Sequence, residues 1–271
     1  MVSPCLSLSS SVHRRVLGAL AVFATCLPGL LAEEAASSEE APTEVRVAMA
    51  DSKPPYIVEG LPGGGIEYAV AEEAFRRGGY EMVPVFVGRG ELVPAVADGQ
   101  AAVALGVAEE EAEGMVLSPG FLRYRYTIVS MARRTQPAEE LSDLASGTVL
   151  AFPGARDLFG GDYAEAVEAN PDYRETPSTE QQLLELCLGI VDQLVIDRFS
   201  LEWYLGEARV NQMCGNQGEL AASDLLVSEV VHAAFADEEL RNSFTQGLLS
   251  MVEDGSFQEL FRLYRLQAAL P

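Results

Sequence analysis

Asp197 is the residue in this sequence best placed for ligand chemistry. It closes the apolar run LVI at 194–196, which predicts a buried strand with a carboxylate at its tip. A carboxylate removed from water needs a compensating charge or hydrogen bonds. The ammonium group of a bound solute would supply that charge, and the neighbouring Arg198 would supply it equally. We favour the solute and treat Asp197 as a candidate ligand-binding residue.

Tyr56 is the second candidate ligand-binding residue. It follows Pro54 and Pro55, just past the first predicted strand. An aromatic ring at that place can stack on a flat or apolar part of a solute. A tyrosine in a turn often only covers the hydrophobic core, so the residues alone leave both interpretations open.

Gly154, Ala155 and Arg156 directly follow a strand predicted at 147–152. Ligands of open α/β sheets bind beyond the carboxyl ends of strands, where loops lead into helices and present backbone N–H groups. The planar guanidinium of Arg156 could bind an anion there with two parallel hydrogen bonds. The alternative partners of Arg156 are Asp157 and water.

Catalytic motifs are missing from the sequence. His232 is the only histidine after the first 13 residues, and its apolar surroundings (VVHAAFA) favour a core position over a catalytic base. No GxSxG, HExxH or phosphate-binding P-loop occurs, and the glycines of GLPGGGIEY lack the spacing of a dinucleotide fingerprint. We therefore expect no catalytic residue, no cofactor and no metal site.

The chain is strongly acidic. Its 271 residues include 41 acidic and 18 basic side chains, which gives a formal net charge of −23. A surface this negative repels nucleic acid, and it offers no basic patch for an anionic membrane. The apolar fraction of 48% with 22% charged residues predicts a globular protein rather than a disordered one.

The first 32 residues are expected to be a secretory signal peptide, followed by a linker at 33–43. His13 to Arg15 precede an apolar run at 16–31, which leads into Ala32 and then acidic residues. Leu30 stands at the third position before the expected cut, where a small residue is usual. An uncleaved anchor is therefore the alternative. Lipidation at Cys26 is less favoured, because the preceding residues lack the usual leucine. The mature chain would then be periplasmic.

Export would allow Cys187 and Cys214 to form a disulfide, since the compartment is oxidising. Two separate thiols, one of them buried, are the alternative, and the sequence does not decide between them. The two cysteines stand 27 positions apart without histidine partners, which argues against a zinc site.

Strands and helices alternate along the chain. Strands are predicted at 44–50, 82–87, 101–105, 126–131, 147–152, 193–196 and 230–235, and helices at 66–79, 91–97, 181–188, 237–253 and 257–268. Strands separated by helices of this length imply parallel pairing and an α/β fold. The passages LVPAVADGQAAVALG and LLELCLGIVDQLVID repeat one order of helix, glycine and strand, which indicates two similar lobes.

This order of elements resembles that of the family 3 extracellular solute-binding proteins, which are type II periplasmic binding proteins. The segments that carry the resemblance are ADSKPPYIV, LSPGFLRYRYTIV, GTVLAFPGARD, GIVDQLVID and the closing EELRNSFTQGLLSMVEDGSFQELFRLYRL. The likeness spans about residues 44–268. It implies two α/β lobes, each a mostly parallel sheet flanked by helices, joined by two strands. Lobe 1 would be 44–130 plus 229–271, and lobe 2 would be 131–228.

The resemblance also implies roles for the candidate residues. Tyr56 stands where the family has the aromatic that stacks on the solute, and Asp197 where many members have the acid that accepts an ammonium. Gly154 and Arg156 stand where the family has a glycine followed by small hydroxyl residues that hold a carboxylate, so Arg156 is a departure.

A second departure lies in lobe 1. The amino-acid binders of the family carry an arginine shortly before the segment that corresponds to LSPGF. This chain has glutamates at 109, 110, 111 and 113 instead, for which we expect a solvated acidic loop. An acid group of the solute would then bind Arg156 or Arg123, or the solute would be a cation.

The resemblance implies a protein that captures a small polar solute between two lobes, and we expect the mature chain to be a monomer. The solute would be amino-acid-like or an organic anion or cation, and the partner would be the membrane permease of an ABC importer. Two alternatives stay open. One is a periplasmic dehydratase-like enzyme in which a pair of carboxylates acts as acid and base. The other is a sensory binding protein that acts on a receptor.

Overall fold

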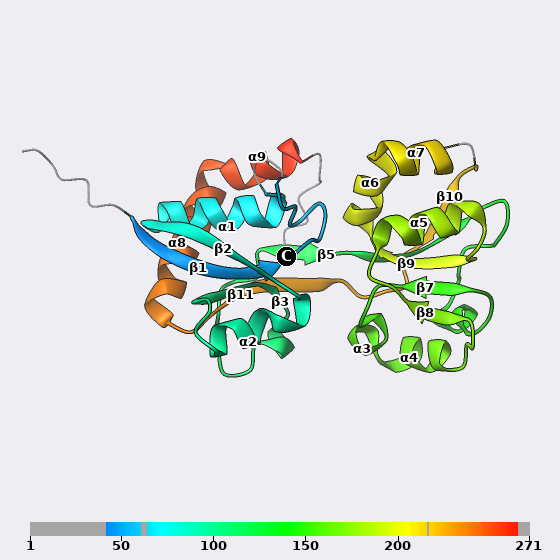
Figure 1. The fold of residues 1–271 in the computed structure, drawn as a ribbon, viewed down its shortest axis with the longest axis horizontal. Coiled ribbons are helices and arrows are strands. Elements are labelled where there is room, and N and C mark those ends of the chain that lie inside the picture. Colours follow the sequence, from blue (N-terminus) through cyan, green and yellow to red (C-terminus); the bar gives the residue numbers. More distant parts are fainter. Residues whose placement is uncertain (1–41, 61–63, 216, 265–271) are drawn as a thin grey trace, which may run out of the picture. The chain divides into compact units, whose positions relative to one another are not determined.

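The structure is a computed structural model that describes residues 42–60, 64–215 and 217–264 (Figure 1). The predicted signal peptide and most of the predicted linker lie outside these residues. Within the described part of the chain, no helix is long and apolar enough to cross a membrane.

A first sheet, with the strand order β2-β1-β3-β11-β4, forms lobe 1, and β5 adds to it by pairing with β11. Its strands are β1 (Thr43–Ala50), β2 (Tyr80–Val87), β3 (Val103–Val107), β4 (Val116–Leu117), β5 (Leu122–Tyr124) and β11 (Glu229–Phe235). β1 pairs in parallel with β2 and β3, whereas β11 runs antiparallel to β3, β4 and β5.

Helices cover both faces of this sheet. They are α1 (Ile66–Arg77), α2 (Leu92–Ala97), α8 (Glu238–Asp254) and α9 (Ser256–Leu263). α1, α8 and α9 lie on one face and α2 lies on the other (Figure 1). Phe75 of α1, Phe235 of β11 and Phe244 of α8 pack with ring centroids 4.8 to 6.4 Å apart, so aromatic contacts join these helices to the sheet.

A second sheet, with the order β10-β6-β9-β7-β8, forms lobe 2. Its strands are β6 (Tyr126–Met131), β7 (Val149–Ala151), β8 (Tyr173–Glu175), β9 (Gln193–Asp197) and β10 (Leu220–Ser223). β7 pairs in parallel with β8 and β9, while β6 runs antiparallel to β9 and β10. Both sheets are therefore mixed, and the antiparallel strands are those next to the crossings between the lobes.

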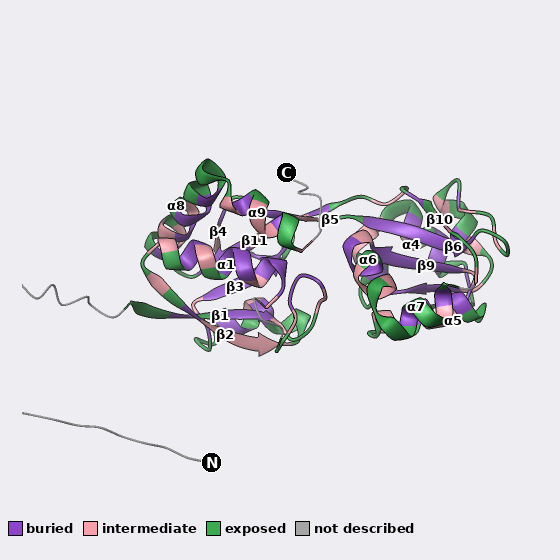
Figure 2. Ribbon diagram, turned by 90° about the horizontal axis from the view of Figure 1, so that it is seen from above, coloured by how far each residue is buried: buried purple, intermediate pink, exposed green. Residues whose placement is uncertain are grey.

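The helices of lobe 2 are α3 (Ala155–Phe159), α4 (Gly161–Glu168), α5 (Thr179–Leu188), α6 (Arg198–Gly206) and α7 (Ala208–Cys214). Short 3-10 turns complete the molecule at Arg89–Glu91, Glu109–Glu111 and Leu141–Ala145. Figure 2 shows that buried residues concentrate on the central strands of both sheets, as expected for sheets covered by helices.

The chain passes from one sheet to the other twice. The first crossing is at Arg125, because β5 ends at Tyr124 in lobe 1 and β6 begins at Tyr126 in lobe 2. The return lies between Ser223 and Glu229. Residues 126–130 therefore pair within lobe 2, whereas the sequence placed them in lobe 1. The apolar strand pattern continues through Arg125, so nothing in the sequence marks the crossing.

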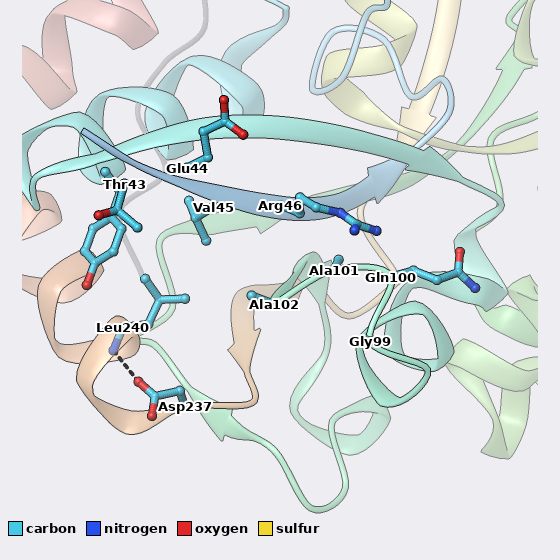
Figure 3. A pocket seen from close by; sticks show the side chains of 11 residues that line it. Thr43, Glu44, Val45, Arg46, Gly99, Gln100, Ala101, Ala102, Asp237 and Leu240 are labelled. Atoms are coloured by element: carbon cyan, nitrogen blue, oxygen red, sulfur yellow. Dashed lines mark hydrogen bonds between the residues drawn. The ribbon is translucent and has the colours of Figure 1, made fainter. Parts of the chain in front are cut away.

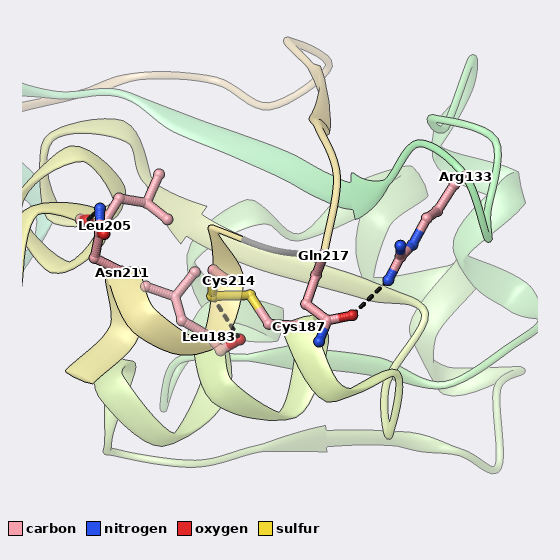
Figure 4. The surroundings of a disulfide bond; sticks show 7 residues. All are labelled: Arg133, Leu183, Cys187, Leu205, Asn211, Cys214 and Gln217. Carbon is pink, nitrogen blue, oxygen red and sulfur yellow. Dashed lines mark hydrogen bonds between the residues drawn. A yellow bond between two sulfur atoms is a disulfide. The ribbon is translucent and has the colours of Figure 1, made fainter. Parts of the chain in front are cut away.

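A disulfide joins Cys187, at the end of α5, to Cys214, at the end of α7 (Figure 4). The Cα atoms are 5.1 Å apart. Both residues lie in a buried apolar cluster with Leu183, Leu186 and Val210. The structure thus shows the disulfide that the sequence left undecided. This bond fixes α7 against α5.

Replacing Cys187 and Cys214 together by alanine should lower the free energy of unfolding by about 3 kcal/mol, because a loop of this length is then no longer closed in the unfolded chain. Urea denaturation measures the change. A reductant should bring the native protein to the stability of the double variant and leave the variant unaffected. Two thiols that react with an alkylating reagent before any reduction would contradict the disulfide.

Candidate functional site

The turn after β1 places Lys53 and Tyr56. The amide of Tyr56 donates to the carbonyl of Lys53 at 2.8 Å, which closes the turn. The carbonyls of Pro55 and Tyr56 then accept from the first amides of α1, those of Ile66 and Glu67, at 3.0 Å each. Because helix amides at this end have no partner within the helix, these bonds hold the turn against the start of α1. Glu67 is thereby fixed close to Tyr56.

Asp197 and Tyr56 are in direct contact, although they belong to different lobes. The Tyr56 hydroxyl lies 3.1 Å from both carboxylate oxygens of Asp197. Asp197 also accepts from the amides of Ser200, at 2.9 Å, and Arg125, at 3.1 Å, and so caps α6. Burial raises the pKa of Asp197, and the Ser200 amide and the Lys53 charge oppose this increase.

Glu67 and Tyr124 form a second buried pair. The Tyr124 hydroxyl donates to Oε2 of Glu67 at 2.6 Å, and the two residues are each only 1% exposed. Burial raises the pKa of Glu67, against the charge of Lys53 and the hydrogen bond from Tyr124. Space for the carboxylate comes from Gly106 in β3, where an added Cβ would lie 2.2 Å from Oε1 of Glu67.

Gly106 is also a backbone irregularity. Val107 pairs with His232 and Leu105 pairs with Ala233, so Gly106 is the extra residue of a β-bulge. Its φ of 75° lies in the left-handed region, which residues other than glycine rarely adopt. The bulge and the missing side chain together admit the Glu67 carboxylate beside the strand.

Glu229 and Tyr126 form a third buried pair at the return crossing. The Tyr126 hydroxyl donates to Oε2 of Glu229 at 2.7 Å. Arg89, just after β2, lies 3.3 Å from Oε1 of Glu229 and 3.4 Å from Oε1 of Glu111. Burial, together with the neighbouring Glu229, raises the pKa of Tyr126 well above its usual value, so this hydroxyl keeps its proton and acts as a donor.

Lys53 lies among these pairs. Its ammonium is 3.1 Å from the centroid of the Tyr124 ring and 5.4 Å from that of Tyr56. Burial lowers the pKa of Lys53 to about 7, and Arg89 adds to this effect. The nearby carboxylates oppose it. A lysine of this kind loses its proton close to neutral pH.

These residues define one site, which we call the acidic tyrosine cluster. It consists of three tyrosine–carboxylate pairs and two cations: Tyr56–Asp197, Tyr124–Glu67, Tyr126–Glu229, Lys53 and Arg89. The cluster can donate hydrogen bonds, present negative charge and offer aromatic faces. Over the described residues, no group of three or more His, Cys, Asp or Glu side chains is arranged to hold a metal ion.

The backbone amides of the loop with Gly154 and Arg156 already bind a carboxylate of the protein itself. The backbone amides of Gly154 and Arg156 donate to the carboxylate of Glu175, at 2.6 and 3.0 Å. The guanidinium of Arg156 is half exposed and lies 3.6 Å from Glu168 and 3.7 Å from Asp157. The Asp157 contact is the alternative that the sequence offered. No contact that the structure gives for the described residues joins Arg156 to the acidic tyrosine cluster, so its role as an anion clamp stays a prediction.

The remaining sequence candidates have local partners. Arg123 is half-buried and donates to the Ser228 hydroxyl at 2.9 Å. Arg198, the alternative partner of Asp197, forms its ion pair with Asp224 instead. His232 is half-buried, with Nδ1 2.9 Å from the carbonyl oxygen of Ser118, as suits a structural residue.

The loop with glutamates at 109, 110, 111 and 113 is only partly the solvated acidic loop that the sequence predicted. Glu109, Glu110 and Glu113 are exposed, which fits a solvated loop. Glu111 is also exposed, but its carboxylate accepts from the Ala108 amide at 2.9 Å and contacts Arg89. Glu111 therefore helps to hold Arg89 beside the acidic tyrosine cluster.

A pocket of about 420 Å³ lies elsewhere in lobe 1 (Figure 3). It is lined by the first residues of β1, from Thr43 to Arg46, together with Gln100 and Asp237. Asp237 is engaged in capping α8, through a bond from the Leu240 amide at 2.8 Å. The pocket lies at the amino end of β1, whereas ligands of such sheets bind at the carboxyl ends, so we take the acidic tyrosine cluster as the candidate functional site.

Solved structures share this fold. An ancestral arginine-binding protein bound to arginine is 17% identical, with a TM-score of 0.65 over 83% of this chain and 99% of that protein. A histidine kinase sensor domain is 19% identical, with a TM-score of 0.66 over 83% and 96%. An amino acid ABC transporter substrate-binding protein from Streptococcus pneumoniae, bound to L-arginine, is 15% identical, with a TM-score of 0.63 over 82% and 94%.

Neither a family model nor a curated protein matches the sequence. The structural similarity nevertheless defines the class of fold. The chain has the two-lobed α/β fold of type II periplasmic binding proteins, with amino-acid-binding proteins among its structural neighbours.

Of the residues in the cluster, Tyr56 and Asp197 were named from the sequence as ligand candidates, a role that stays a prediction, and the others were not named. Lys53 carried a signal, because it is the only lysine in the chain and stands directly before Pro54. The spacing of the two tyrosines in YRY, residues 124–126, was a second signal, since residues two apart in an extended chain face the same side. Nothing in the sequence pointed to Glu67 or Glu229, whose burial depends on the tertiary fold.

Gly106→Ala should destabilise the protein by about 2 kcal/mol or more, because the methyl group meets the Glu67 carboxylate and the backbone is strained. Gly99→Ala is the matched control. Gly99 has a similar φ of 71° with no atom near an added Cβ, and it should cost only the strain, about 1 kcal/mol. Chemical denaturation compares the two. Equal losses would show that Gly106 makes no special room for Glu67.

Lys53→Met should remove part of the pH dependence of stability. Between about pH 7 and 10.5 the folded chain has lost the Lys53 proton and the unfolded chain keeps it, so native stability rises with pH in that window. The increase is at most about 1.4 kcal/mol per pH unit. Urea denaturation at about pH 7.5 and about pH 9 should show a larger increase for the native protein than for Lys53→Met. Parallel increases would contradict the lowered pKa.

Proposed function

We propose that this chain is an exported solute-binding protein that captures a small polar solute at the acidic tyrosine cluster. The observation that carries the proposal is the bond between Tyr56 and Asp197, which brings the carboxyl ends of β1 and β9 together from two lobes. In α/β sheets these strand ends are where ligands bind.

The chemistry of the two residues supports this assignment. Asp197 is 5% exposed, and its present partners are all neutral donors. A solute ammonium would add a direct ion pair, which this buried carboxylate lacks among the contacts that the structure gives for the described residues. The Tyr56 ring is fully buried and packs against the rings of Tyr124 and Phe199, so its contact with an apolar part of the solute stays a prediction. If the solute carries an acid group, the exposed guanidinium of Arg156 or that of Arg123 is the proposed partner.

The partner protein follows from the proposed class. We propose that the chain acts as a monomer in the periplasm and delivers its solute to the permease of an ABC importer; the streptococcal neighbour, an amino acid ABC transporter substrate-binding protein, supports this role. The sensor-domain neighbour supports a second candidate, in which the bound state is read by a receptor. Genes for a permease and an ATPase beside this gene would favour import, and a kinase gene would favour sensing.

A thermal-shift screen of the mature chain against amino acids, polyamines, compatible solutes and small organic acids tests the proposal. A solute present at 100 times its dissociation constant should add roughly 2.7 kcal/mol to stability. A screen in which none of these classes stabilises the chain would contradict a solute-binding function.

Asp197→Asn should weaken binding of the solute found in the screen by roughly 2 to 5 kcal/mol, because the partner charge is then left without its counter-ion. Asp224→Asn is the matched control, since Asp224 is an exposed acid outside the cluster, and it should leave binding unchanged. Titration calorimetry gives both values. Unchanged affinity of the Asp197→Asn variant would show that the solute binds outside the acidic tyrosine cluster.

Arg156→Ala should have little effect on the affinity for a solute without an acid group, because the Arg156 guanidinium is exposed and its acidic neighbours, Asp157 and Glu168, lie outside the cluster. The same calorimetry measures it. A loss of binding comparable to that of Asp197→Asn would instead place an acid group of the solute beside Arg156.

A further inference from the structure

The single lysine of the chain is positioned as a bound cation would be. The Lys53 ammonium lies over the face of Tyr124, 3.1 Å from the ring centroid, with the Tyr56 ring 5.4 Å away. An ammonium over an aromatic face is attracted by the negative charge of that face. Across the described residues, no ion pair within 4.0 Å and no side-chain hydrogen bond is formed by this ammonium, so the ring is its closest favourable contact.

The charged groups around Lys53 come from every neighbouring element. Three are buried carboxylates: Glu67 from α1, Asp197 from the end of β9 and Glu229 from β11. One is a cation, Arg89, from the segment after β2. Tyr56, Tyr124 and Tyr126 supply neutral hydroxyls that point at the carboxylates.

Buried carboxylates around aromatic faces are suited to an organic cation. The carboxylates attract the charge, and the rings replace the water that a bulky cation gives up. Lys53 fills this arrangement without a direct ion pair, so its ammonium can leave without breaking one. The arrangement therefore marks a cation position that the chain occupies with its own side chain.

We propose that the acidic tyrosine cluster binds the cationic group of an organic solute and that Lys53 is a tethered competitor for this position. The solute group is a primary ammonium, a guanidinium or a quaternary ammonium. This inference rests on the proposed solute-binding function and names its ligand class. When the solute binds, its cation takes the place on Tyr124, and the Lys53 side chain turns out of the cluster.

The competition depends on pH. Burial lowers the pKa of Lys53 to about 7, so the competing charge is present at pH 6 and largely absent at pH 8.5. Affinity for a permanently charged cation should rise as pH rises through this range. Burial also raises the pKa of Glu67 and of Asp197, so a variant without Lys53 is needed to separate the contribution of Lys53 from theirs.

The experiment is titration calorimetry of the mature native chain, Lys53→Met and Lys53→Arg with choline, L-arginine and L-glutamate, at pH 6 and pH 8.5. Lys53→Met removes the charge and keeps a chain of similar length. Lys53→Arg keeps a charge that does not titrate in this range. At pH 6, Lys53→Met should bind choline or arginine roughly tenfold more tightly than the native chain. At pH 8.5 the two should agree within about twofold, while Lys53→Arg stays weak at both values.

Two results would overturn the inference while leaving the proposed function intact. One is tight binding of L-glutamate by the native chain that is lost in Lys53→Met, which would make Lys53 an anion-binding residue. The other is binding of neither cation by any of the three proteins, while the broad thermal-shift screen finds another solute. Failure of that screen with every solute class is the separate result that would reject solute binding itself. Melting curves of the variants confirm that they fold.

Discussion

The burial of three carboxylates at one place is the constraint on which this structure depends. Removing a carboxylate from water costs several kcal/mol unless strong donors replace the water. Here each acid has a tyrosine hydroxyl: Tyr56 for Asp197, Tyr124 for Glu67 and Tyr126 for Glu229, at 2.6 to 3.1 Å. Hydrogen bonds to ionised acceptors are stronger than neutral ones, so these pairs offset much of the cost.

The tyrosine pairs also connect the two lobes. Tyr124 and Tyr126 flank Arg125, where the chain first crosses, and Glu229 begins the strand that completes the return. Two of the three pairs, Tyr56–Asp197 and Tyr126–Glu229, join a residue of one lobe to a residue of the other. A cation that binds these acids, as we propose, therefore acts on contacts that join the two lobes.

The sequence predicts much of the fold and little of the site. Hydrophobic periodicity located the main strands and helices, and Asp197 was identified because a charge at the tip of an apolar strand is unusual. The crossing at Arg125 was missed because strand character continues through it. Helices α3, α4, α6 and α7 were missed, because no element was predicted from the sequence for the stretches that form them. Glu67 resembled an ordinary exposed first-turn residue of α1, and only the bulge at Gly106 and the hydroxyl of Tyr124 explain its burial.

The central claim is that an organic cation and Lys53 compete for one position. Because the chain has one lysine, selective labelling with 13C-lysine gives a single Cε signal by NMR. The claim predicts that this signal titrates near pH 7 in the free protein. It also predicts that saturating choline or arginine at pH 6 moves the signal toward the position of a solvent-exposed ammonium. A signal that titrates near 10.5 and does not respond to either cation would contradict it.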